Sequence, residues 1–320
     1  MIEVGFVLLT HSEPDQVLRL ARVLTELYDA PPIACHHDFS QCPLDKDRFP
    51  QNVHFVEPHY PTFWGCFSII PAAIAGMRSL LEKRNPPDWL YLLSGSDYPA
   101  ASPDAVRSML GETRFDAFID HREIGCAGPI AVENESELTG FSRSSYRSIA
   151  YRRYCAVAVP RPSLKKPLAF PPVGRTYLNH PMWRSMLGGP FSNEFRCFAG
   201  EHWFTANAQA AAILVQETEV SKRLWAHLQT RESPEECYYH SILGNAPLRL
   251  SGDNLRYIDW PSVDAWHPRT LTLADLLAIV RSGAHFARKT AHGSELTNAL
   301  DRICGVGLRN AEPVRADCVD

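Results

Sequence analysis

Four groups of polar residues directly follow short apolar stretches of this sequence. They are His11-Ser12, His36-His37-Asp38, Ser94-Gly95-Ser96-Asp97 and Arg288-Lys289. Ligands of open α/β sheets bind outside the carboxyl ends of the strands, so these positions are the first candidates for chemistry. The sequence contains no GxGxxG or GxxxxGK(S/T) fingerprint, which argues against a dinucleotide oxidoreductase or a P-loop NTPase.

Two acids among these groups have alternative interpretations. Asp38 could accept hydrogen bonds from a ribose or a base edge, or it could cap its own loop as an Asx turn. A metal site formed with the neighbouring histidines is disfavoured, because adjacent residues of a strand point to opposite faces. Asp97 could hold a sugar hydroxyl or, with a metal ion, a diphosphate. Gly95 supplies no second acid two residues away, which favours the metal-free interpretation.

A third acid stands at a predicted helix start. In Ser233-Pro234-Glu235-Glu236, the serine is placed to cap the helix and the proline to begin it. A glutamate there either stabilises the helix dipole or faces a cleft as a general base. Acid, base and aromatic residues also combine in Glu201-His202-Trp203, a pattern suited to a sugar site. Trp64-Gly65 offers a stacking surface beside a close backbone approach, or a core tryptophan beside a turn.

Arg288-Lys289 is the basic pair among the four groups. Two adjacent cations can neutralise a leaving diphosphate without a divalent ion, because arginine binds phosphate in a bidentate manner and lysine acts as a point charge. The alternative is a solvated basic pair on the surface.

Short apolar runs and helical periodicity alternate along most of the chain. Strands are predicted at Val4–Thr10, Pro32–His37, Val53–Val56, Trp89–Leu93, Ala284–Ala287 and Leu255–Asp259. Ser94–Pro99 is predicted to be a loop, and Ser102-Pro103 to start a helix. Further helices are predicted at Pro14–Tyr28, Phe67–Leu81, Trp203–Thr218, Val220–Thr230, Glu235–Leu243, Leu273–Arg281 and Glu295–Ile303. This alternation predicts a mainly parallel, three-layer α/β sheet.

The charge of the chain is unevenly distributed. The 320 residues have a formal net charge of −4, which argues against a dedicated nucleic-acid binder. No acidic residue occurs between Glu137 and Glu194, whereas nine basic residues do: Arg143, Arg147, Arg152, Arg153, Arg161, Lys165, Lys166, Arg175 and Arg184. We interpret residues 143–184 as an irregular basic insertion that favours an anionic acceptor. Solvated surface and peripheral membrane association are the alternatives.

Nine cysteines without CxxC pairs, and no apolar run long enough to span a membrane, predict a cytoplasmic protein. We expect a single domain at 1–305, with an insertion at 121–197, and a tail at 306–320.

The order and spacing of several motifs resemble glycosyltransferase family 14. This family contains the core-2/I-branching β-1,6-N-acetylglucosaminyltransferases and the peptide O-xylosyltransferases. The resemblance covers about residues 4–110 and 198–303. Its motifs are Thr10-His11-Ser12, Cys35–Asp38, Phe63-Trp64-Gly65, Leu92–Pro99, Gly200–Phe204, Ser233–Leu243, Arg256–Trp260, His267-Pro268 and Phe286–Lys289.

The resemblance implies a GT-A type fold and inverting transfer of a sugar from a UDP-sugar to an acceptor hydroxyl, without a metal ion or other cofactor. Within this catalytic domain, 1–120 would form the nucleotide-sugar half and 198–305 the acceptor half. The expected sugar is N-acetylglucosamine or xylose, and the expected acceptor is a saccharide, a lipid-linked sugar or a peptide. Glu236 matches the catalytic carboxylate, and Arg288 and Lys289 match the diphosphate-binding pair. Donor contacts are expected from His11, Asp38, Trp64, Gly65, Ser96 and Asp97, and sugar or acceptor contacts from Glu201, His202, Trp203 and Trp260.

Two departures from the family pattern remain. His202 stands where the xylosyltransferases carry aspartate, so the donor sugar is left open. No counterpart of the membrane anchor and stem of the animal members is expected, as in a cytosolic, bacterial relative. A metal-dependent transferase using Asp97 or Asp38 and a non-catalytic carbohydrate- or nucleotide-binding module are the rival interpretations.

Overall fold

A computed structural model describes residues 2–125, 143–162, 173–178, 189–262, 265 and 267–307. In this part of the chain the main feature is a seven-stranded sheet. Its strands are β1 (Val4–Thr10), β2 (Ile33–His37), β3 (Val53–Phe55), β4 (Trp89–Ser94), β6 (Ala117–Ile119), β11 (Phe204–Asn207) and β12 (Leu250–Ser251). They lie in the order β12-β6-β11-β4-β1-β2-β3, and all neighbours are parallel except the two pairs that β11 makes.

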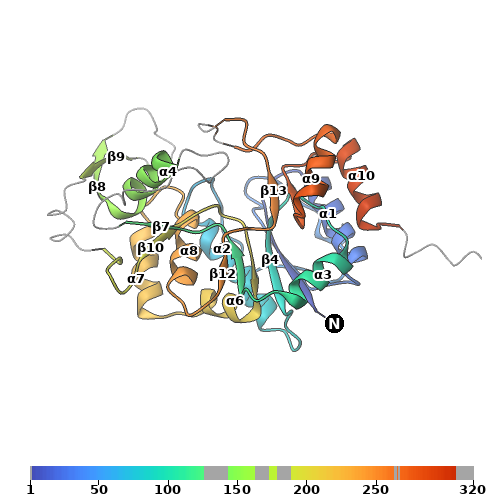
Figure 1. The fold of residues 1–320 in the computed structure, drawn as a ribbon, viewed down its shortest axis with the longest axis horizontal. Helices are drawn as coiled ribbons and strands as arrows, with labels where there is room; N and C mark the ends of the chain where they lie inside the picture. The colour runs from blue at the N-terminus through green and yellow to red at the C-terminus, as the bar shows by residue number, and fades with distance from the viewer. Residues whose placement is uncertain are drawn as a thin grey trace, which may run out of the picture.

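Helices cover both faces of this sheet (Figure 1). One face packs on α2 (Ile69–Leu81), α6 (Ala208–Val215), α7 (Glu219–Leu228) and α8 (Glu235–Gly244). The other packs on α1 (Pro14–Leu27), α3 (Pro103–Glu112) and α10 (Glu295–Cys304). Alternate residues of β1 face opposite layers, with Val7 in one core and Phe6 and Leu8 in the other. The predicted three-layer, mainly parallel α/β architecture is confirmed, and it is consistent with a GT-A-like fold.

Local sequence signals fix several helix ends. Ser102 accepts a hydrogen bond from the backbone nitrogen of Ala105 at the start of α3. α9 (Leu276–Ser282), which follows the short helix η3 (Leu273–Asp275), ends at Gly283 with φ of 70°. Glycine adopts this left-handed conformation without steric cost.

A smaller sheet carries the basic pair. It joins β13 (Arg256–Ile258), β14 (Phe286–Arg288) and β5 (Asp97–Pro99), with β14 in the centre. β14 runs antiparallel to β5, and Arg288 pairs in register with Asp97. This sheet therefore brings Asp97, from the first part of the chain, next to Arg288, from the last part.

Two sequence predictions are wrong at this level. Ser94–Pro99, predicted as a loop, contains β5, and the helix predicted at Trp203–Thr218 is β11 followed by α6. β11 lies between β4 and β6 and hydrogen bonds to both. These long-range hydrogen bonds, rather than local periodicity, decide that Phe204–Asn207 is extended.

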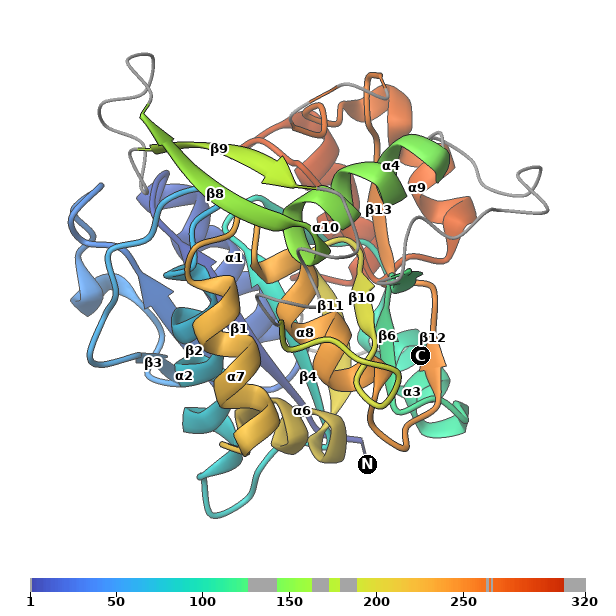
Figure 2. The same cartoon turned by 90° about the vertical axis from the view of Figure 1, so that its left-hand side faces the viewer.

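The basic insertion contains regular structure that its sequence pattern did not indicate. It forms α4 (Arg143–Ala150), the π-helix η2 (Tyr151–Cys155) and an antiparallel hairpin of β8 (Val157–Pro162) and β9 (Val173–Leu178). Figures 1 and 2 both place these elements at the end of the molecule opposite the N-terminus, where the carboxyl end of β1 lies. Lys165, Lys166, Arg184 and the side chains of Arg143, Arg161 and Arg175 lie outside the described residues.

Candidate active site

The candidate site is built at the carboxyl ends of the parallel strands. β1, β2 and β4 end at neighbouring positions, since Thr10 pairs with His37 and Leu9 with Ser94. Exposed His11 follows β1, and buried Asp38 follows β2. The sequence expectation that these groups share one edge of the sheet is met.

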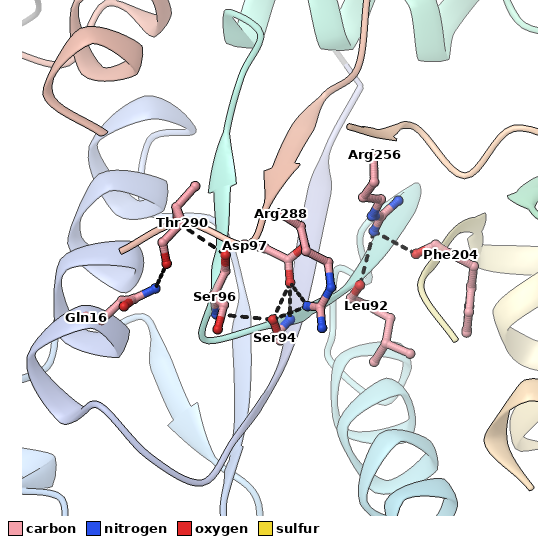
Figure 3. A network of polar contacts seen from close by, with 9 residues as sticks. All are labelled: Gln16, Leu92, Ser94, Ser96, Asp97, Phe204, Arg256, Arg288 and Thr290. Carbon is pink, nitrogen blue, oxygen red and sulfur yellow. Dashed lines mark hydrogen bonds and ion pairs between the residues drawn. The ribbon is translucent and has the colours of Figure 1, made fainter. Parts of the chain in front are cut away.

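Asp97 holds Arg288 in place (Figure 3). Its Oδ2 accepts hydrogen bonds from the backbone nitrogen of Ser94 at 2.6 Å and from Arg288 Nη1 at 3.0 Å. The side chain of Asp97 is 0% exposed and that of Arg288 12% exposed. Asp97 thus contacts Arg288 and the end of β4, and a direct contact of Asp97 with a ligand stays a prediction.

Ser96 fixes the segment that follows the basic pair. Its carbonyl oxygen accepts hydrogen bonds from the backbone nitrogen of Thr290 at 2.9 Å and from the Thr290 hydroxyl at 3.2 Å (Figure 3). The contact of Ser96 with a donor, expected from the resemblance, remains untested. In the structure, Ser96 positions Thr290, the residue that follows Lys289.

Arg288 and Lys289 form a concentrated positive site. Arg288 Cζ lies 4.3 Å from the centroid of the Trp203 ring. Burial, and then the charge of Arg288, lower the pKa of half-buried Lys289. Among the described residues no carboxylate forms an ion pair with Lys289, so its charge is left for another anion.

Two aromatic residues border this positive site. Trp64 is 61% exposed, and its ring meets the His267 ring edge-on at 5.2 Å between centroids. Burial, followed by the charges of Lys289 and Arg288, lowers the pKa of His267, which therefore lies close to the basic pair. His267 belongs to a motif of the resemblance but was given no role from the sequence. Its partner Trp64 is separated from it by more than half of the chain, so no local pattern could find the contact.

Glu236 lies in the first turn of α8, at the meeting point of two other segments. The backbone nitrogen of Ser233 donates to the carbonyl oxygen of Gly65 at 3.0 Å, which joins the Trp64-Gly65 loop to the start of α8. Gly65 has φ of 66°, a conformation that favours glycine. From the insertion, the Tyr154 hydroxyl donates to the carbonyl oxygen of Ser233 at 2.7 Å.

The Glu236 carboxylate has the properties of a base that works near neutral pH. Its side chain is 30% exposed, and Oε2 accepts a hydrogen bond from Arg153 Nη1 at 3.1 Å. Burial raises its pKa to about 7; Arg153 opposes this shift, whereas Glu201 and Asp120 add to it. Its neighbour Glu235 is buried, which raises the pKa of Glu235 to about 8.

Glu201 interacts electrostatically with both Glu236 and Arg288 of the basic pair. Its two carboxylate oxygens accept hydrogen bonds from Trp260 Nε1 at 3.1 Å and from Asn254 Nδ2 at 2.8 Å. Burial, and then Asp120, raise the pKa of Glu201, and Arg288 opposes them. Glu201 is therefore within electrostatic reach of both Glu236 and Arg288.

Two comparisons with known proteins bear on the family of this chain. The profile of the Core-2/I-Branching enzyme family matches residues 172–280, which include the Glu201, Glu236 and Trp260 segments. A curated protein of Arabidopsis thaliana, "Beta-glucuronosyltransferase GlcAT14A", is 23% identical over 261 residues, which make up 78% of this chain and 50% of that protein. Both findings support the resemblance to glycosyltransferase family 14. The chain spans half the length of this curated relative.

His202 is the residue that departs from the family pattern. Its ring packs edge-on against Trp203, 4.4 Å between centroids, and lies 5.6 Å from the ring of Tyr239. Burial lowers the pKa of His202 to about 3, so the ring is neutral. The structure thus places His202 against aromatic side chains, and the sugar contact of His202 stays a prediction.

The Asp38 carboxylate accepts hydrogen bonds from the loops around it. Although burial opposes ionisation, hydrogen bonds from Ser40, Gln41 and Thr62 hold the pKa of Asp38 well below its usual range. The backbone nitrogen of Thr62 donates to Oδ2 at 2.6 Å, so Asp38 fastens the segment that leads to Trp64. These bonds are those of the loop-cap alternative. The nucleoside contact implied by the family remains a prediction.

The described residues contain no group of three histidine, cysteine, aspartate or glutamate side chains that could hold a metal ion. His36 and His37 are both bonded internally: His36 Nε2 accepts from the backbone nitrogen of Tyr60, and His37 Nδ1 lies 2.8 Å from the Thr10 hydroxyl. No helix in the described ranges is long and apolar enough to cross a membrane.

Proposed function

We propose that this protein transfers a sugar from a UDP-sugar to an acceptor hydroxyl, with inversion at the anomeric carbon and without a divalent metal ion. The observation that carries the proposal is the pairing of two sites. Glu236 is a half-buried carboxylate with a pKa of about 7, Arg288 and Lys289 form the basic pair, and Glu201 interacts electrostatically with both Glu236 and Arg288. The similarity to family 14 supports the reaction class.

In the proposed reaction the proton and the leaving group go to opposite sides of the sugar. Glu236 takes the proton of the acceptor hydroxyl while its oxygen attacks the anomeric carbon. The bond from that carbon to the β-phosphate oxygen breaks, and UDP leaves with its added negative charge opposite Arg288 and Lys289. The proton on Glu236 then passes to solvent. An attack from the face opposite UDP inverts the anomeric configuration.

The donor sugar and the acceptor are proposed as classes. N-acetylglucosamine and xylose are the sugars expected from the resemblance, and the name of the Arabidopsis relative adds glucuronate. A saccharide, a lipid-linked sugar or a peptide hydroxyl is the proposed acceptor. Trp64 is expected to contact the donor, and the contact of its ring with His267, whose pKa is lowered by burial and by the charges of the basic pair, supports this proposal.

The decisive experiment combines ligand binding with one substitution. UDP, UDP-N-acetylglucosamine, UDP-xylose, UDP-glucuronate, UDP-glucose and UDP-galactose are compared by thermal shift, since a bound ligand raises the melting temperature by mass action. With the donor that binds, Glu236→Gln is expected to remove most turnover while UDP affinity is retained. The absence of binding by all six nucleotides, or wild-type turnover by Glu236→Gln, would contradict the proposal.

A further inference from the structure

The basic insertion reaches the catalytic carboxylate through one residue. Arg153 Nη1 lies 3.1 Å from Glu236 Oε2, and the side chain of Arg153 is 23% exposed. The adjacent Arg152 is exposed, and none of the described carboxylates forms an ion pair with it. Two neighbouring arginines of the same π-helix therefore have different environments.

The backbone around Arg153 is held firmly against the second half of the fold. Arg231 Nη1, just after α7, donates to the carbonyl oxygens of Arg153 at 3.2 Å and Ala156 at 2.8 Å. His227 Nε2 lies 2.8 Å from the carbonyl oxygen of Tyr154, whose fully buried ring places its hydroxyl on Ser233. Bonds to α7, to the segment after it and to the start of α8 thus fix the Arg153 position.

We propose that Arg153 is a positioning residue for the proposed base: it holds one oxygen of Glu236, leaves the other for the acceptor hydroxyl, and keeps the carboxylate ionised. This inference rests on the proposed function. The hydrogen bond from Arg153 goes to Oε2 of Glu236. A carboxylate with one oxygen bonded presents the other in a fixed direction, which is the geometry a general base requires.

A counter-charge is needed here because Glu236 is surrounded by groups that oppose its ionisation. Burial and two carboxylates raise its pKa, and Arg153 is the cation that opposes them. The charged and titratable groups that face Glu236 are Arg153 and Tyr154 of η2, Tyr146 of α4, Asp120 with its ion-pair partner Arg122, Glu201, and Glu235 of α8. Asp120 is already paired with Arg122 at 3.1 Å. Without Arg153 the protonated form of Glu236 would therefore be favoured.

The test measures the titration of Glu236 directly, independent of turnover. NMR is recorded on the full chain labelled at the glutamate carboxyl carbon, and the Glu236 signal is assigned by its loss in Glu236→Gln. In Arg153→Ala we expect the midpoint of this titration to rise by about 1–2 pH units, the usual size of the effect of a close opposite charge. Arg153→Lys, which keeps the charge, should restore most of the shift. Arg152→Ala, the matched control, should leave the midpoint unchanged.

Turnover supplies the second readout. The acid limb of kcat/KM in Arg153→Ala should move to higher pH in parallel with the titration, and activity at pH 7 should fall by about tenfold, while UDP affinity is retained. An unchanged titration midpoint in Arg153→Ala, or an equal shift in Arg152→Ala, would overturn the positioning role. If Arg153→Ala fails to fold, Arg153→Met and Arg153→Lys give the same comparison of a neutral and a charged side chain. A shifted titration in a protein without any transferase turnover would instead contradict the proposed function.

Discussion

The guanidinium of Arg288 contacts both an acid and an aromatic ring: its Nη1 is 3.0 Å from Asp97 Oδ2, and its Cζ is 4.3 Å from the centroid of Trp203. Asp97 comes from the first half of the fold and Trp203 from the second. A cation fixed on two sides in this way loses little freedom when an anion binds. The Arg288 side chain therefore contacts both halves of the proposed donor site.

We expect Arg288→Ala to weaken UDP binding about 10- to 100-fold, because a charge-assisted hydrogen bond contributes about 1.5–3 kcal/mol. Trp203→Leu should weaken it less, since it removes only the cation–π contact and leaves Asp97 in place. Isothermal titration calorimetry with UDP measures both. Unchanged UDP affinity in Arg288→Ala would refute the diphosphate role.

Turnover should increase with pH through about 7. The base must be ionised, and burial raises the pKa of Glu236 to about 7, so the protonated form dominates below that pH. The pH profile of kcat/KM for the free enzyme measures this value. An acid limb near pH 4.5, the ordinary range of glutamate, would show that Glu236 is not the base.

Chelation should leave turnover intact. Asp97, the acid that the metal-dependent alternative would use, is wholly buried and bonded to Arg288. Initial rates with EDTA are compared with rates in excess Mn²⁺ or Mg²⁺. A strict requirement for manganese would establish the metal-dependent alternative.

Asp38→Ala should lower the melting temperature by several degrees. The substitution leaves the donors of Ser40, Gln41 and Thr62 without their buried acceptor, at a cost of about 1–3 kcal/mol for each unsatisfied group. Asp45→Ala is the control, because Asp45 caps an exposed turn. Lost UDP affinity with an unchanged melting temperature would instead indicate the direct nucleoside contact.

Stability should decrease as the pH falls below about 6.5. Burial lowers the pKa of His36 to about 4, of His240 to about 3 and of His285 to about 4. The unfolded chain binds protons at these residues near pH 6.5 and the folded chain does not, so stability present above 6.5 is lost as the pH falls toward the folded pKa values. Each residue contributes up to about 2 kcal/mol of this loss at pH 5. Melting temperatures between pH 7 and pH 5 test it, and a flat profile would contradict it.

Local pattern was sufficient for the long elements. β1 at Val4–Thr10 and α1 at Pro14–Leu27 coincide with the predicted strand and nearly with the predicted helix, because hydrophobic periodicity specifies which face is buried. Periodicity does not predict β5 and β11, because they have only three and four residues. Both are extended because they hydrogen bond to neighbouring strands. Such strands have no periodicity of their own to detect.

The sequence by itself determined the acid at the start of α8, the two cations after an apolar run, and the strand ends where a ligand site would form. Only the tertiary structure decided that Asp97 is paired with Arg288, 191 residues away, and that Arg153 reaches Glu236 across 83 residues. The reason is physical: a helix start or a strand end follows from neighbouring residues, whereas an ion pair depends on the strand pairing and packing that bring distant segments together.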